Sequence, residues 1–147
     1  MEKTYDRGNI SESILLQAYL KAGFIVSIPF GSGAPYDLLV DTGTHTYKIQ
    51  VKTGWHNRGR LLYKGRRRIK DSNRNGTRRY RLDEVDYFAV YDPQNDRIYV
   101  IPPQDMGVDG CLRIESALNG QQRFIRWAHD YTWEQHVGKL RSETAPA

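Results

Sequence analysis

The sequence predicts an α/β domain, and three observations support this. Apolar residues recur at helical spacing over residues 10–22, and Gly23 provides a C-terminal stop. Residues 36–53 have the pattern of a β-hairpin, with two strands around a polar turn. Residues 85–91 form a nearly continuous apolar run, which suits a strand in the middle of a sheet buried on both faces. We therefore expect a β-sheet covered by helical structure.

The remaining elements follow in order along the chain. The first helix is expected to be capped by Asn9 or Ser11. We predict strands at 24–29, 36–40, 47–53, 85–91, 97–101 and 124–128, and a final helix at 130–139. We also predict loops at 30–34, 54–59 and 71–76, with a short strand or helix over 61–70.

Length and composition indicate one domain. The chain has 147 residues, and we expect a single domain over 1–140 followed by a disordered tail at 141–147. A hydrophobic content of 39% without a long apolar run argues against a membrane protein, and no signal peptide is expected. The single cysteine, Cys111, excludes an internal disulfide and a cysteine-rich zinc site. We expect an intracellular, cytoplasmic protein without a membrane partner.

Three polar side chains are expected to converge in the hairpin. Strict alternation over 47–53 places Gln50 and Lys52 on one face, and Asp37 at the start of the preceding strand can lie beside both. Such a group suits metal-dependent phosphodiester cleavage, because Mg²⁺ prefers oxygen ligands and activates water, while a lysine orients that water or stabilises developing charge. Alternatively, Asp37 only starts a strand, and Gln50 and Lys52 form a solvated face.

The first helix contributes another acid. Glu12 precedes Leu15 and Leu16 by three and four residues, at the border of the buried face, so it should point toward whatever the helix covers. The alternative is a carboxylate favoured in the first turn by the helix dipole. The four histidines show no close metal-ligand spacing, and we interpret them as surface or structural residues.

All of the excess positive charge lies in residues 58–81. This stretch has a charge of +10, whereas the whole chain has +5. It indicates a polyanionic partner, and its excess of arginine favours bidentate contacts to phosphate or guanine. A solvated face or a targeting signal are alternatives, although the apolar and tyrosine residues within the stretch indicate ordered structure. The predicted DNA-binding residues, in an insertion at about 55–82, are Arg58, Arg60, Lys64, Arg66, Arg67, Arg68, Lys70, Arg74, Arg78, Arg79 and Arg81.

With Glu12 on a helix, Asp37 on a strand, Gln50-x-Lys52 on the next strand and the apolar strand at 85–91, the chain resembles the PD-(D/E)xK nuclease superfamily. Most of that superfamily has Asp or Glu at the position of Gln50. The chain therefore resembles more closely a Gln-x-Lys branch, which includes small homing endonucleases encoded in cyanobacterial group I introns. The resemblance covers approximately residues 5–103.

The resemblance implies a mixed β-sheet flanked by helices, with a restriction-endonuclease-like core. It implies Glu12, Asp37 and Gln50 as ligands of Mg²⁺, for which Mn²⁺ can substitute, and Lys52 as the residue that positions or activates water. These four residues would form the catalytic site. It further implies site-specific cleavage of double-stranded DNA by a homo-oligomer, either a dimer or a tetramer, since each protomer holds one site.

Two other functions fit the same residues. A nuclease similar to Holliday junction resolvases would recognise four-way junctions by shape, although such enzymes usually carry Glu-x-Lys. A DNA-binding module on the same scaffold, with weak or no turnover, would be compatible with the neutral Gln50.

Overall fold

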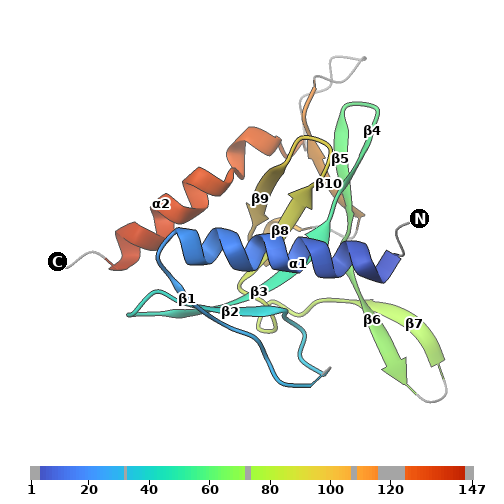
Figure 1. Cartoon of the computed structure of the whole chain (residues 1–147). Coiled ribbons are helices and arrows are strands. Elements are labelled where there is room, and N and C mark those ends of the chain that lie inside the picture. Colours follow the sequence, from blue (N-terminus) through green and yellow to red (C-terminus); the bar gives the residue numbers. More distant parts are fainter. Residues whose placement is uncertain (1–3, 32, 72–73, 107–108, 116–124, 145–147) are drawn as a thin grey trace.

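The computed structural model describes residues 4–31, 33–71, 74–106, 109–115 and 125–144 (Figure 1). A five-stranded mixed sheet forms its centre, in the order β1-β2-β3-β8-β9. These strands are β1 (Ile25–Ser27), β2 (Leu38–Asp41), β3 (Thr46–Thr53), β8 (Tyr87–Asp92) and β9 (Arg97–Ile101). β3 and β8 are parallel, and the other neighbours are antiparallel.

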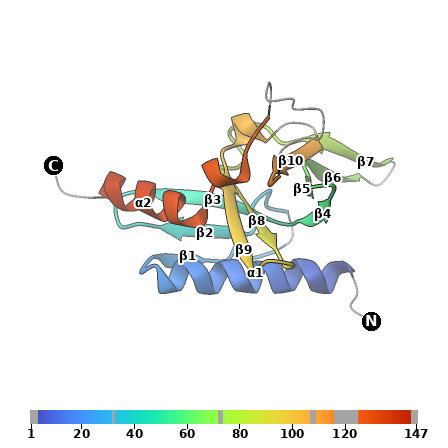
Figure 2. The same cartoon turned by 90° about the horizontal axis from the view of Figure 1, so that it is seen from above.

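Both helices belong to the core on one face of this sheet. The helix α1 (Thr4–Lys21) lies along the sheet in Figure 2, and α2 (Trp133–Thr144) packs near its end. Leu15 and Tyr19 of α1 and Leu140 of α2 are fully buried in the same apolar cluster. From the sheet, Ile49 and Val51 of β3 contribute to this cluster, as their alternation predicts.

The opposite face is covered by a smaller antiparallel sheet in the order β10-β5-β4. Its strands are β4 (Trp55–Asn57), β5 (Arg60–Lys64) and β10 (Asp109–Arg113). Leu61 and Leu112 from this sheet pack against Phe88 and Val90 of β8, and all four side chains are fully buried. Every residue of β8 is buried, so the prediction of a strand covered on both faces is confirmed.

The basic stretch continues from the small sheet into an antiparallel hairpin. Its strands β6 (Arg66–Asp71) and β7 (Arg74–Arg79) pair with each other, and Figure 1 shows the hairpin projecting from the body of the molecule. The register places Arg66 opposite Arg79 and Arg67 opposite Arg78. Like charges at directly opposed positions destabilise a hairpin. An anion bound at these positions would reduce the repulsion.

The mixed sheet with flanking helices confirms the predicted fold class. The predicted end of α1 is also confirmed: Gly23 has a φ of 96°, its amide donates to the Leu20 carbonyl and the Phe24 amide donates to the Tyr19 carbonyl. These two bonds form a Schellman motif, which requires the left-handed conformation that glycine adopts without strain.

Several predicted boundaries are wrong. α1 begins at Thr4, so Asn9 and Ser11 lie inside the helix and do not cap it. The predicted loops at 54–59 and 71–76 contain strand β4 and the start of β7, since backbone pairing across the hairpins outweighs their polar composition.

The C-terminal part differs as well. The structure describes residues 125–128 of the predicted strand at 124–128, and there it has a single bridge at Trp127 and the start of the 3₁₀-helix η2 (Ala128–Asp130). α2 continues to Thr144, so the predicted tail is wrong for 141–144, because burial of Leu140 and the Arg141 bond to the Ala22 carbonyl hold the last turns. Residues 145–147 of the predicted tail lie outside the described residues. No helix within the described ranges is long and apolar enough to cross a membrane.

The two helices are joined by a buried polar contact. The Tyr19 hydroxyl lies 2.9 Å from His136 Nε2 and shares a hydrogen bond with it. Burial, assisted by the charge of Lys139, lowers the pKa of His136 from 6.5 to about 3. His136 is therefore a neutral structural residue, which confirms the structural interpretation for this histidine.

This histidine makes stability depend on pH. Between pH 6.5 and about 3 the unfolded chain binds a proton at His136 that the native state does not, so the free energy of unfolding falls as the pH is lowered through this window. We expect a loss of roughly 2–3 kcal/mol between pH 6.5 and 4.5 from this residue. Urea unfolding of the wild type and of His136→Gln over this range measures it. Equal pH slopes for the two proteins would contradict the prediction.

Candidate active site

Asp37 is held at the start of β2 by the neighbouring strand. Its amide donates to the Ile49 carbonyl at 2.8 Å, and its carboxylate oxygen Oδ2 accepts a hydrogen bond from the Val51 amide at 2.9 Å. The chain before β2 thus continues the pairing with β3 through the backbone amide and the side chain of Asp37. This fixes the Asp37 carboxylate at the start of β2, beside Val51, the residue before Lys52.

Glu12 of α1 lies near Asp37. The two carboxyl groups are close enough that each affects the titration of the other. Burial, and then the charge of Asp37, raises the pKa of Glu12 to about 7. Burial also raises the pKa of Asp37, against opposing effects of the Val51 amide, Glu12 and Lys52. The pair therefore retains a proton near neutral pH, since both charges together are unfavourable in a half-buried site.

Lys52 lies on β3 within electrostatic reach of Asp37. Its ammonium donates a hydrogen bond to the Tyr80 hydroxyl at 3.0 Å and lies 4.9 Å from the centre of the Tyr80 ring. Burial, opposed by Asp37 and assisted by Lys64, lowers the pKa of Lys52 to about 8. An amine with this pKa can exist in both protonation states near neutral pH, which suits a group that transfers a proton or orients water.

Gln50 is half-buried two residues before Lys52. Its side-chain nitrogen Nε2 donates to the Val51 carbonyl at 3.3 Å, so Oε1 is the remaining polar atom of this side chain. Gln50, Glu12 and Asp37 all lie in the described part of the chain. Among these described residues, no hydrogen bond joins Gln50 to either of the two acids. The structure thus brings Glu12, Asp37 and Lys52 together, whereas a shared site with Gln50 stays a prediction.

The predicted DNA-binding residues lie on or beside strands β5, β6 and β7. Arg58 precedes β5 with a φ of 51°, Arg60 and Lys64 lie on β5, Arg79 ends β7, and Arg81 follows it. The side chains of Arg66, Arg67, Arg68, Lys70 and Arg74 lie outside the described residues. Arg78 makes a bidentate ion pair with Glu84, with N–O distances of 2.7 and 2.8 Å. Glu84 is only 5% exposed, so this pair connects the base of the hairpin to the core.

Two residues of the site were not predicted from the sequence. Tyr80 binds Lys52 from 28 positions away, and Glu84 binds Arg78 and accepts a hydrogen bond from the Arg81 amide. Both lie where the basic stretch returns to the apolar strand β8. An acid and an aromatic residue at that boundary are weak sequence signals of a functional role. Their partners depend on where the β6–β7 hairpin leads the chain, which no local pattern indicates.

Comparison with known proteins places this arrangement in a family. The family model described as PD-(D/E)XK endonuclease matches residues 2–134, which is most of the chain. The chain belongs to the PD-(D/E)XK endonuclease family. The resemblance inferred from the sequence is thereby confirmed, and membership supports a nuclease activity.

One solved structure shows the same fold over the whole chain. It is that of a bacterial homing endonuclease, I-Ssp6803I, with a TM-score of 0.74 and 23% sequence identity. The match covers 99% of this chain and 100% of the homing endonuclease. A search of curated proteins gives no match. At this identity the structural likeness establishes the fold, and the chemistry must be argued from the residues.

Proposed function

We propose that this PD-(D/E)XK endonuclease is a Mg²⁺-dependent, site-specific enzyme that hydrolyses phosphodiester bonds in double-stranded DNA. One observation carries the proposal: the carboxyl groups of Glu12 and Asp37 are close enough to affect each other's titration at the start of β2, and the charge of Lys52 acts on Asp37. Two half-buried acids with raised pKa values beside a lysine with a lowered pKa are typical of a catalytic site.

The donor atoms of the site fit a hard divalent cation. Among the described residues, no group of three or more His, Cys, Asp or Glu forms a cluster able to hold a metal. The oxygens of Glu12 and Asp37, together with Oε1 of Gln50, are the donors that we assign to Mg²⁺, which keeps several water ligands when few protein oxygens are present. A bound cation would neutralise charge on the phosphate and lower the pKa of water. Mn²⁺ should substitute.

The protein residues have separate tasks in this scheme. The Val51 amide holds the Asp37 carboxylate in a fixed orientation through a 2.9 Å hydrogen bond. Glu12 lies on α1, and its pKa is raised to about 7. Both carboxyl groups are therefore ionised only above neutral pH. Lys52, oriented by Tyr80, either directs the attacking water or stabilises negative charge on the phosphate.

The β6–β7 hairpin supports duplex DNA as the substrate. Two-stranded ribbons are of a size that enters the DNA major groove, and arginine contacts phosphates and guanine edges there. The hairpin projects from the body, and its base is fixed by the Arg78–Glu84 pair. Site specificity follows from placing such a ribbon in the groove at a set position relative to Lys52.

Cleavage of a random-sequence library of linear duplexes with Mg²⁺, followed by sequencing of the new ends, tests the function. The proposal predicts ends at a recurring sequence and none in the presence of a chelator. Ends found only when four-way junctions are supplied would indicate a junction-resolving nuclease. DNA binding that is insensitive to chelator and gives no product with Mg²⁺ or Mn²⁺ would indicate a binding module without turnover.

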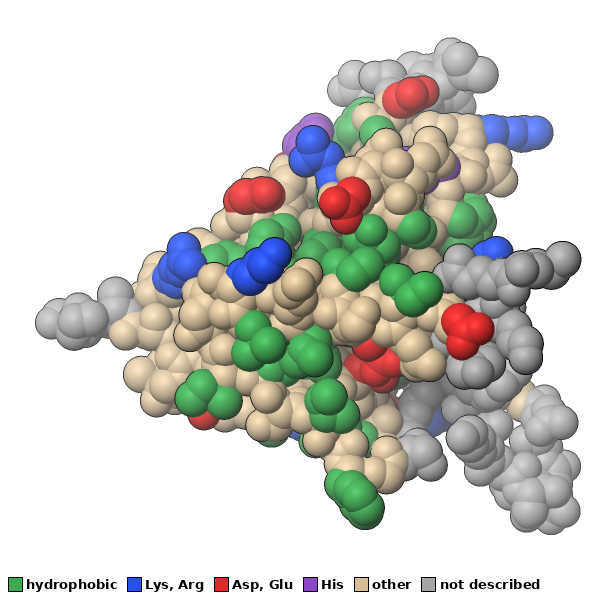
Figure 3. Space-filling view, viewed as in Figure 1, with side chains coloured by type: hydrophobic (Ala, Val, Ile, Leu, Met, Phe, Trp, Pro, Cys, Tyr) green, Lys and Arg blue, Asp and Glu red, His purple; other side chains and the backbone are tan. Residues whose placement is uncertain are grey.

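An exposed apolar surface supports assembly into a homo-oligomer. Hydrophobic side chains gather over α1 and the strand below it in Figure 3, and Leu20, Ile25, Ile28 and Phe30 are each more than half exposed. Contiguous apolar patches of this kind are typical of protein interfaces. Because one protomer holds one catalytic site, two copies are required to cut both strands, and we infer a dimer or a tetramer.

The apolar surface predicts the effect of charge on assembly. We expect the wild type to sediment as a dimer or tetramer of the 17.1 kDa chain, and the variant with both Ile28→Asp and Phe30→Asp to sediment mainly as a monomer at micromolar concentration, because buried charges would be unpaired. Leu82→Asp, which adds a charge at another exposed apolar residue, is the matched control and should keep the wild-type assembly. A monomeric wild type would refute this inference.

A further inference from the structure

A pocket of about 580 Å³ adjoins the candidate active site. It lies between the end of β7, strand β8 and the 3₁₀-helix η1 (Pro103–Asp105). Its volume is in the range of pockets that hold small organic ligands. Its lining includes Arg79, Tyr80, Leu82, Phe88, Met106 and Arg126.

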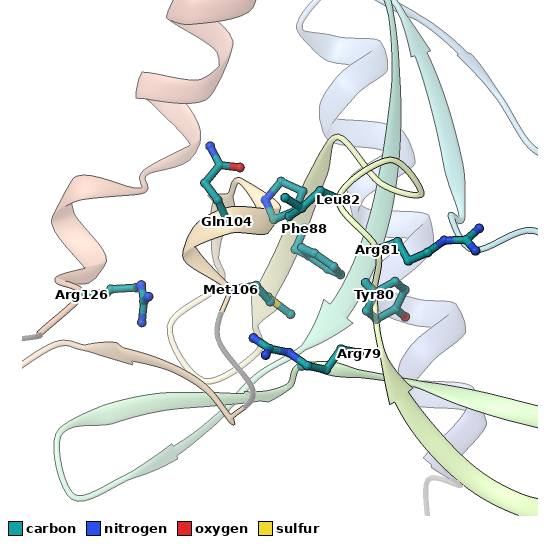
Figure 4. A pocket seen from close by; sticks show the side chains of 10 residues that line it. Arg79, Tyr80, Arg81, Leu82, Phe88, Gln104, Met106 and Arg126 are labelled. Atoms are coloured by element: carbon teal, nitrogen blue, oxygen red, sulfur yellow. The ribbon is translucent and has the colours of Figure 1, made fainter.

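The pocket has a cationic side and an apolar side. In Figure 4 the guanidinium group of Arg79 lies beside Met106, and Arg126 extends toward them from the opposite wall. Arg81 instead extends away, toward Asp83 and Glu84. No hydrogen bond or ion pair joins the Arg79 or Arg126 side chain to another described residue. Two guanidinium groups are therefore available for one anionic group.

The apolar side is suited to a flat ring. Phe88 and Met106 are buried at the back of the pocket, and Leu82 at its edge is 68% exposed. The apolar surface that Leu82 exposes to water is unfavourable, and a planar ligand that covers it would remove this contact with water. Tyr80 packs edge-on against Phe88, with ring centres 4.9 Å apart, and stabilises this wall.

Tyr80 also connects the pocket with the catalytic residues. Its ring lines the pocket, and its hydroxyl accepts the hydrogen bond from Lys52. The Tyr80 side chain therefore separates a ligand in the pocket from the amine that we assign to the reacting phosphate. A nucleotide next to the cleaved bond combines the required features, namely an anionic phosphate and a planar base at this location.

We propose that this pocket is a subsite for one unstacked nucleotide of the DNA strand, with its phosphate between Arg79 and Arg126 and its base over Leu82, in front of the buried Phe88 and Met106. The proposal rests on the proposed nuclease function for the identity of the strand. The nucleotide would leave the base stack to enter the pocket, and this cost is smallest at weakly paired or mismatched positions.

The chain offers a specific reporter for binding in this pocket. It has two methionines, Met1 and Met106, so a protein labelled with ¹³C-methyl methionine gives two methyl NMR signals, and Met106→Leu assigns them. We expect thymidine 3′,5′-bisphosphate, added without divalent cations, to shift the Met106 signal and leave that of Met1 in place. Inorganic phosphate and thymidine, each carrying half of the recognised chemistry, should bind more weakly.

Matched variants separate the two sides of the pocket. Arg79→Gln should weaken thymidine bisphosphate at least about tenfold, because a charge-assisted contact is lost. Arg97→Gln, at an exposed arginine outside the pocket, should leave the affinity unchanged. Leu82→Ala should weaken thymidine bisphosphate severalfold without affecting inorganic phosphate.

Two results would overturn the subsite. One is a Met106 signal that no compound shifts. The other is equal binding of inorganic phosphate and thymidine bisphosphate that Leu82→Ala does not change, since this would indicate a phosphate contact alone. The titration requires neither metal nor turnover, so it can fail while DNA cleavage is observed, and it can succeed if cleavage is absent. The two proposals are thus tested separately.

Discussion

Replacing Lys52 by alanine should lower the rate of DNA cleavage about 10³-fold while leaving DNA affinity nearly unchanged. The size of the effect follows from what one positioned proton-transfer or charge-stabilising group contributes to catalysis. Lys52 is half-buried, lies near Asp37 and donates a hydrogen bond to Tyr80, which fixes the position of its amine. Affinity should persist because we assign most of the contacts to the DNA backbone to the basic β6–β7 hairpin.

Lys48→Ala is the matched control for this prediction. Lys48 belongs to the same strand, and its amine donates to the Asp83 carbonyl at 3.1 Å, outside the Glu12–Asp37–Lys52 group. Single-turnover cleavage and equilibrium DNA binding should be measured on both variants, with unfolding curves to confirm that each is folded. A Lys52→Ala protein that cuts at the wild-type rate would contradict the assignment, as would equal impairment of Lys48→Ala.

The parts of the fold that could be predicted are those with a local pattern. The alternation in β3 determined which side chains face the helices, and the apolar composition of β8 indicated burial on both faces. Gly23 ended α1 for a reason that can be read from the sequence, since the turn requires a positive φ. In these segments local preference and tertiary packing agree.

Local patterns indicated a short strand or helix over 61–70, where β5 and β6 lie, but not the pairing of the small sheet or of the basic hairpin. β6 and β7 consist almost entirely of charged and polar residues, so no alternation of apolar residues marks them, and only their mutual pairing makes them strands. β10 was missed because its partner β5 is more than forty positions earlier in the chain. Long-range pairing of this kind leaves little trace in the sequence of either strand.

The same distinction holds for the candidate site. Asp37 and Lys52 are close in sequence and joined by one hairpin, so their proximity follows from the β2–β3 register. Glu12 could be placed by the periodicity of α1, since the helix presents it toward the sheet. Tyr80 could not, because its contact with Lys52 depends on how the whole basic stretch returns to β8.

The largest effect on stability is expected for Phe88→Ala. Phe88 is fully buried on β8, opposite Gln50 of β3 and Ile101 of β9, where the small sheet packs on the central one. Removing a buried aromatic ring loses its transfer free energy and leaves a cavity, which costs about 3–5 kcal/mol. Domains of this size have about 5–15 kcal/mol of stability in total, so the variant should remain folded with little margin.

Urea unfolding at fixed pH measures this loss, with Phe88→Leu as the control that keeps a large apolar side chain. Leucine retains most of the apolar volume and should cost less than about 1.5 kcal/mol. Ile98→Ala, at a half-buried position of β9, should also cost much less than Phe88→Ala. If Phe88→Ala costs under about 1 kcal/mol, the side chain is not enclosed between the two sheets. In that case Tyr80 would lack the wall that orients it toward Lys52, and the geometry of the candidate site would fail together with the packing of β8.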